Sequence, residues 1–194
     1  MATVIIASAF VLFLFTSPSQ DAPPVQPYRP IVKQESFKPS QESKKSLFSF
    51  IKKSNPKLDN KEAEDIAYWI DEYATKEDVD PKLVAALIGR ESSFQKKAIS
   101  KTGAKGLGQI KDFNFKSLEI EDPFDIKQNV RGTVKYLKEL KTMWKDSNEQ
   151  NKMALASYYQ GPNKTKKNKE TLPNHVTKYV DDILKKYNTL KKKN

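Results

Sequence analysis

One glutamate, Glu91, closes the apolar face of a predicted helix, where a charged side chain is unusual. Asp80 is a suitable N-cap and Pro81 suits the first turn, so the helix is expected to begin there. Glu91 follows Leu87 by four residues and Ile88 by three, which places it on their face. Burial raises the pKa of a carboxyl group, and a carboxyl that keeps its proton near neutral pH can serve as a general acid. The alternative is a glutamate at the helix end that points to water.

The segment after this helix is a loop rich in glycine. Gly103, Gly106 and Gly108 fall within six residues, which rules out an ordinary helix or strand. Such a loop lets the backbone approach a packed neighbour or a ligand closely. No lysine followed by serine or threonine comes after the last glycine, so the segment does not match a phosphate-binding loop. Taken alone, the loop is weak evidence for any function. A glutamate, a serine and this loop in that order and spacing form a much more specific pattern.

In that order and spacing, the chain resembles the lytic transglycosylase family, whose catalytic domain is related to goose-type lysozyme. The resemblance covers roughly residues 60–187 and is carried by segments 91–94, 100, 103–110, 122–125, 128–132, 136–137, 154–158, 161–162, 172–173 and 179–180. It implies an all-α, lysozyme-like (goose-type) helical domain with a groove. It also implies an enzyme that works without a cofactor.

The resemblance further implies cleavage of the β-1,4 bond between N-acetylmuramic acid and N-acetylglucosamine in peptidoglycan, with a 1,6-anhydro product. In that family one glutamate is both acid and base, and Glu91 matches it. Ser100 and Gln109 match positions that line the groove and contact the substrate. Tyr158 matches a tyrosine whose hydroxyl lies near the catalytic glutamate. From residue type alone, these three would be a loop-capping serine, a surface amide and a core tyrosine.

The chain departs from the family pattern at three places. Gly108 stands where the family often has methionine, and Tyr159 and Gln160 follow the tyrosine where asparagine is usual first. Asn174 and His175 stand where a Glu-Thr pair is usual, so a second acid near the groove is missing. These changes leave two alternatives to the transglycosylase: a lysozyme-type hydrolase on the same fold, and a non-catalytic module that binds peptidoglycan.

The first 20 residues are expected to be a signal peptide or an uncleaved N-terminal membrane anchor. The apolar run over residues 4–15 is shorter than the roughly 20 residues of a standard membrane-spanning helix, and no basic residue precedes it. Either interpretation places the domain outside the inner membrane, in the periplasm or elsewhere in the cell envelope.

Residues 21–59 are rich in proline, lysine and serine and predict a disordered linker. Within it, the run 47–51 is expected either to pack on the domain or to form a brief helix. Residues 60–187 are expected to be the catalytic domain, with apolar helical stripes in 60–75, 130–144, 153–159 and 175–187. Residues 188–194 are a basic tail.

The composition restricts the partners. The 194 residues contain no cysteine and one histidine, which argues against disulfides and a metal site. The net charge of +11 favours an anionic partner, and membrane lipids, wall polymers and peptidoglycan all qualify. No nucleic acid is expected, because no DNA- or RNA-binding module is recognisable and the leader indicates export. Secretion or other envelope machinery is a further partner compatible with this activity.

Overall fold

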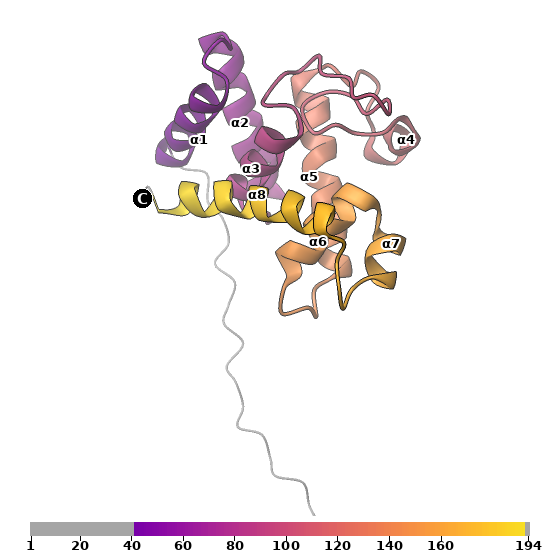
Figure 1. Cartoon of the computed structure of the whole chain (residues 1–194). Coiled ribbons are helices and arrows are strands. Elements are labelled where there is room, and N and C mark those ends of the chain that lie inside the picture. Colours follow the sequence, from indigo (N-terminus) through magenta and orange to yellow (C-terminus); the bar gives the residue numbers. More distant parts are fainter. Residues whose placement is uncertain (1–40, 193–194) are drawn as a thin grey trace, which may run out of the picture. The chain divides into compact units, whose positions relative to one another are not determined.

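The computed structural model describes residues 41–192, which form helices and loops (Figure 1). The helices are α1 (Gln41–Ser54), α2 (Asn60–Lys76), α3 (Pro81–Glu91), the 3-10 turn η1 (Asp112–Asn114), α4 (Phe115–Leu118), α5 (Ile126–Met143), α6 (Gln150–Gln160), α7 (Pro162–Lys167) and α8 (Asn174–Lys191). No strand occurs within this range, where two isolated β-bridges lie in the loop after α3. The predicted all-α class is therefore confirmed. The leader and residues 21–40 of the predicted linker lie outside the described residues.

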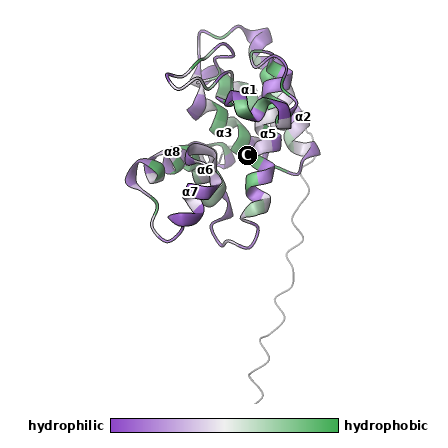
Figure 2. Cartoon of the chain, turned by 90° about the vertical axis from the view of Figure 1, so that its right-hand side faces the viewer, coloured by the Kyte–Doolittle hydropathy of each residue, from purple (hydrophilic) through white to green (hydrophobic). Residues whose placement is uncertain are grey.

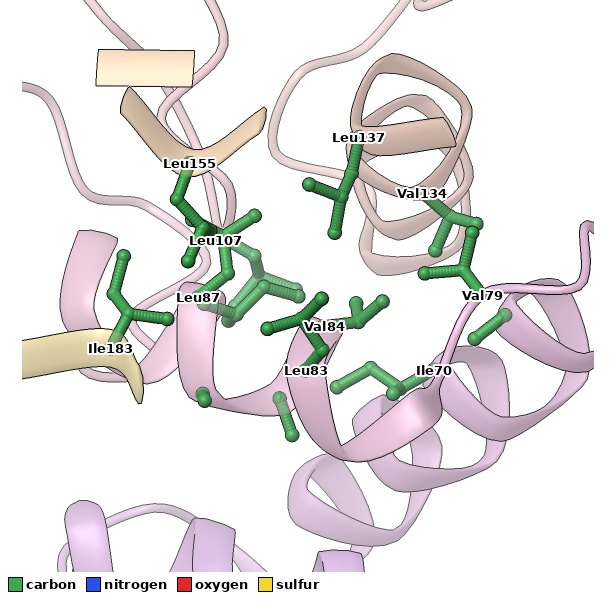
Figure 3. Close-up of a cluster of buried hydrophobic side chains, with 14 of the residues drawn as sticks. Ile70, Val79, Leu83, Val84, Leu87, Leu107, Val134, Leu137, Leu155 and Ile183 are labelled. Carbon is green, nitrogen blue, oxygen red and sulfur yellow. The ribbon is translucent and has the colours of Figure 1, made fainter. Parts of the chain in front are cut away.

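Helix α3 lies at the centre of the fold. It packs against α1, α2, α5 and α8, and every residue from Leu83 to Gly89 is buried. Figure 3 shows Leu83, Val84 and Leu87 of α3 among side chains from other helices. These partners are Ile70 of α2, Val134 and Leu137 of α5, Leu155 of α6 and Ile183 of α8. A helix that is apolar on all sides is stable only inside a core. Glu91, the last residue of this helix, therefore lies next to an environment from which water is excluded.

Aspartate caps fix where three of the helices begin. Asp59, Asp80 and Asp125 accept backbone N–H bonds at the first turns of α2, α3 and α5, respectively. The predicted cap at Asp80 is therefore confirmed. The second carboxylate oxygen of Asp80 accepts a bond from the Tyr187 hydroxyl of α8 at 2.6 Å. One side chain thus sets the start of α3 and ties it to the helix that crosses it.

Helix α1 falls inside the segment predicted to be a linker, yet it is part of the core. Leu47 and Ile51 are fully buried, and the Phe50 ring meets the edge of the Phe94 ring at 5.9 Å. The Ser43 hydroxyl donates to the buried carboxylate of Asp71 on α2 at 2.6 Å. Residues 41–54 are therefore part of the folded domain and not of a disordered linker, and the run 47–51 is both helical and packed on the domain. Likewise α8 runs into the predicted tail.

Apolar residues are gathered inside and polar residues outside (Figure 2). Helix α3 is largely green, hydrophobic, and lies among the other helices, while much of the loop backbone is purple. Of the helices between residues 41 and 192, none combines the length and the apolar composition needed to cross a bilayer.

Candidate active site

The chain turns sharply directly after Glu91. Ser92 ends α3, and the next two residues, Ser93 and Phe94, have φ angles of 51° and 62°. Left-handed backbone is unusual for residues other than glycine and is strained for a bulky side chain such as phenylalanine. The turn buries the Phe94 ring completely and exposes Ser93. The turn therefore ends α3 at Glu91, and Glu91 lines a groove.

The carboxyl of Glu91 is mostly removed from solvent and has one hydrogen-bond donor. The Tyr179 hydroxyl of α8 donates to its Oε1. Burial raises the pKa of Glu91 to about 7, although the bond from Tyr179 and the charge of Arg90 both lower it. A substantial fraction of Glu91 is therefore protonated near neutral pH, and its conjugate base is also available. This is the property that a general acid and base requires.

Tyr179 is itself held from several sides. Its ring stacks on Tyr159 with centroids 4.4 Å apart, and the Arg90 guanidinium lies 5.3 Å from its centroid. Arg90 in turn pairs with Asp182, one turn further along α8, at 3.3 Å. Burial and the neighbouring Glu91 hold the pKa of Tyr179 well above its usual range. The phenol therefore stays protonated and remains a donor to the carboxyl.

The glycine-rich loop is fastened to α5 by one buried amide. Asn129 accepts the Gly108 N–H at 2.8 Å and donates to the carbonyls of Lys105 and Pro123 at 3.2 and 2.8 Å. Gly106 has a φ of 76°, and a Cβ there would come within 2.2 Å of the Asn129 amide. This glycine is required both by its backbone conformation and by the close approach.

Gly108, one of the departures from the family pattern, also has a packing reason. A Cβ at this position would lie 1.9 Å from the Thr133 hydroxyl of α5. Thr133 is buried and donates to the Asn129 carbonyl at 2.8 Å, so it is not free to move away. In this chain the threonine occupies the space that a side chain at position 108 would need.

The structure places the predicted substrate contacts Ser100 and Gln109 at the groove, where both hold the loop. The Ser100 hydroxyl accepts the N–H of Ala104 at 3.0 Å. The Gln109 amide donates to the carbonyls of Ala98 and Gly106 at 3.1 and 2.9 Å. Their backbone-bonding roles explain why these polar types occur here. Contact with substrate stays a prediction for both.

Tyr158 also lines the groove, but its hydroxyl does not bond the Glu91 carboxyl. It donates to the Gly108 carbonyl at 2.7 Å, and its ring lies against Tyr136 at 5.1 Å. The hydroxyl that bonds the Glu91 carboxyl belongs to Tyr179. We predicted Tyr179 only as a residue of the core face of its helix. Its place in the segment 179–180, which carries part of the family resemblance, was the available signal.

The groove has a volume of about 420 Å³ and is open to solvent. Its lining comes from the end of α3, from the following loop and η1, and from α5 and α6. The lining residues are Glu91, Ser100, Thr102, Ala104, Gln109, Ile110, Lys111, Phe113, Asn114, Tyr136, Tyr158, Tyr159, Gln160 and Gly161. Glu91 is the only acidic residue among them. Across residues 41–192, no three His, Cys, Asp or Glu side chains are grouped so as to bind a metal ion.

Comparison with known proteins gives the family. A family model described as "Transglycosylase SLT domain" matches residues 68–180, more than half of the chain. The chain belongs to the transglycosylase SLT domain family. The match includes α3, the loop, α5 and α6 and ends just after Tyr179. Helix α1 and the last turns of α8 lie outside it.

Individual relatives of this SLT domain are membrane-bound lytic murein transglycosylases F. The protein from Desulfosudis oleivorans is 29% identical over 162 residues, covering 64% of this chain and 36% of the relative. The protein from Vibrio campbellii is 41% identical over 88 residues, or 44% of this chain and 16% of the relative. The chain therefore spans little more than a third of the length of the first relative, and less of the second.

A solved structure has the same fold. It is the X-ray structure of an inactive glutamate-to-glutamine mutant of the lytic transglycosylase Slt from Pseudomonas aeruginosa. The two share a TM-score of 0.57 and 19% sequence identity, over 65% of this chain and 24% of Slt. The predicted lysozyme-like fold is thus confirmed.

Proposed function

We propose that this domain is a peptidoglycan lytic transglycosylase in which Glu91 acts alone as acid and base. The observation that carries the proposal is the state of Glu91 within the groove. Its carboxyl has a pKa of about 7, accepts a bond from Tyr179, and has no acidic neighbour among the groove-lining residues. The family membership and the names of the relatives, which are lytic murein transglycosylases, support the substrate.

The first step uses the protonated form of Glu91. Its proton passes to the oxygen that links the anomeric carbon of N-acetylmuramic acid to C4 of N-acetylglucosamine. The bond between that oxygen and the anomeric carbon then breaks, and N-acetylglucosamine leaves with a free 4-hydroxyl group. Burial of Glu91 serves this step, because a carboxyl with an ordinary pKa would be almost fully ionised near pH 7.

The second step uses the carboxylate that remains. The C6 hydroxyl of the muramic acid attacks its own anomeric carbon and gives its proton to Glu91, which returns to its initial state. The product is a 1,6-anhydro ring. Glycosidases that work by attack of water or a protein nucleophile commonly place a second carboxylate about 5 to 9.5 Å from the acid. The lining of this groove supplies no such residue, which favours the internal hydroxyl as nucleophile.

Mass spectrometry of digested peptidoglycan tests this proposal. Purified sacculi treated with the protein should release muropeptides that end in 1,6-anhydro-muramic acid, and Glu91→Gln should release none while keeping its fold. Glu64→Gln, an exposed exchange on α2, is the matched control and should act like the parent protein. Products one water heavier would assign a hydrolase instead. Retention on sacculi without any release would assign a binding module.

An envelope location belongs to the same proposal. The relatives named as membrane-bound transglycosylases support it, and so does the net charge of +11, since envelope polymers and lipid surfaces are anionic.

A further inference from the structure

Two aromatic side chains in the groove are exposed to solvent instead of being packed in the core. Phe113 of η1 is 81% exposed and Tyr159 at the end of α6 is 47% exposed. Among residues 41–192, only five large hydrophobic side chains are exposed, and these two line the same groove. An exposed apolar ring gains free energy when a ligand covers it, at roughly 25 cal/mol for each Å² removed from water.

The two rings come from different elements that line the groove. Phe113 follows the glycine-rich loop, whereas Tyr159 belongs to the group formed by α6, α7 and α8. In Figure 1 the loop between α3 and α4 lies at the top, and α6 and α7 lie at the bottom. A molecule that lies in the groove beside Glu91 therefore has two aromatic lining residues within the same groove, carried by separate elements.

Tyr159 is pre-positioned rather than loose. One neighbour is Tyr179, on which it stacks at 4.4 Å, and another is His175, whose ring centroid lies 5.9 Å away. Both neighbours belong to α8, so the position of the ring is fixed before a ligand arrives. Fixed rings lose little conformational entropy on binding, which makes them efficient contact surfaces.

The geometry points to an aromatic clamp, formed by Phe113 and Tyr159, that stacks on the pyranose rings of the glycan strand. The faces of a pyranose carry C–H groups and are apolar, so they suit aromatic faces. This inference rests on the proposed function for the identity of the glycan. It adds that these two residues bind the sugar and that Tyr159, a departure from the family pattern, contributes to substrate affinity.

Calorimetry with chitohexaose, a soluble N-acetylglucosamine oligomer, tests the clamp in the full chain carrying Glu91→Gln. Phe113→Ala and Tyr159→Ala should each raise Kd by about five- to tenfold, because each removes one stacking surface. Tyr159→Phe keeps the ring and should stay within about twofold of the parent. Tyr68→Ala, on α2 and 43% exposed, is the matched control outside the groove and should not change Kd.

Kinetics on sacculi with the active chain provide the second arm. Phe113→Ala should raise the half-saturating sacculus concentration and leave kcat unchanged, which a loss of fold or of acid catalysis would not do. An unchanged Kd in Phe113→Ala would overturn the clamp, as would a Tyr159→Phe variant as weak as Tyr159→Ala. If the active chain released no anhydro product but the alanine variants still weakened chitohexaose binding, the transglycosylase proposal would fail and the clamp would stand.

Discussion

At the scale of single residues, the pKa of Glu91 is set by two opposing effects. Burial at the end of α3 favours the neutral acid, while the Tyr179 hydroxyl and the Arg90 charge favour the carboxylate. Burial is the larger effect, and the resulting pKa of about 7 lies where both protonation states are populated. A carboxyl group adapted in this way should cost stability, because the fold must hold it in a protonation state that the unfolded chain does not share.

Glu91→Gln should therefore stabilise the protein at alkaline pH. Between pH 4.5 and about 7 the folded chain keeps a proton on Glu91 that the unfolded chain releases, so stability falls as pH rises through this window. A pKa rise from 4.5 to about 7 corresponds to a cost of about 3 kcal/mol above pH 7, which glutamine does not incur. Urea unfolding of the parent protein and of Glu91→Gln at pH 4.5 and pH 8 measures the difference in their free energies of unfolding. A stability difference that does not depend on pH would contradict the raised pKa.

Tyr179→Phe should move the pH dependence of cleavage and lower its rate. Removing a donor to the carboxylate raises the pKa of Glu91 further, so the loss of kcat/KM at high pH should shift upward by about one pH unit. We expect kcat to fall by about tenfold as the carboxyl loses its positioning bond.

The control for this prediction is Tyr158→Phe, measured over the same pH range. It removes a hydroxyl that bonds the Gly108 carbonyl and should reduce stability while leaving the high-pH limb in place. If Tyr158→Phe shifted the limb and Tyr179→Phe did not, the assignment of Tyr179 as the partner of Glu91 would be wrong.

At the scale of elements, the groove depends on the glycine-rich loop, which is held by hydrogen bonds within the loop and by its attachment to α5. The buried side chain of Asn129 bonds three backbone groups of the segment 105–123. Gly106 and Gly108 allow that approach, since a Cβ at either position would overlap α5 side chains. The loop is therefore placed by packing against a rigid helix, which suits residues that must line a site.

Gly108→Ala should destabilise the protein by about 1–3 kcal/mol through overpacking against Thr133. The double variant Gly108→Ala with Thr133→Ala removes the hydroxyl that the new methyl group would meet, and should recover part of the loss. Thermal unfolding of the two variants and of Thr133→Ala alone gives the coupling energy. If the effects of the two substitutions on stability were strictly additive, overlap with Thr133 would not be the reason for glycine at position 108.

At the scale of the whole molecule, the folded unit is larger than the part that matches the family. Helix α1 lies outside residues 68–180, yet it contributes Leu47 and Ile51 to the core and supports Phe94 through Phe50. Phe94 comes three residues after Glu91, so α1 supports the turn that positions the Glu91 carboxyl, the proposed acid and base.

Leu47→Ala should therefore destabilise the domain by about 2–5 kcal/mol, the range for loss of a fully buried leucine. Ser49→Ala on the same helix is exposed and should change stability by less than about 0.5 kcal/mol. Chemical unfolding of the full chain measures both. Equal, small effects would mean that α1 is not part of the cooperative unit.

The sequence by itself determined the features that depend on neighbouring residues. The N-cap at Asp80, the helical class, the glycine-rich loop and the general-acid role proposed for Glu91 all follow from signals within a few positions, combined with the order of the family motifs. Caps and apolar periodicity act locally, so they can be identified before the fold is known.

Only the tertiary structure decided which tyrosine meets Glu91 and whether α1 belongs to the core. Tyr179 lies 88 residues from Glu91, and it reaches the carboxyl because α8 crosses α3, whereas Tyr158 on α6 is directed to the loop at Gly108. The apolar residues of α1 are few and lie beside a proline- and lysine-rich segment, so their burial depends on the surface that α2 and α3 offer. Contacts between distant segments are set by the packing of whole helices, which no local pattern specifies.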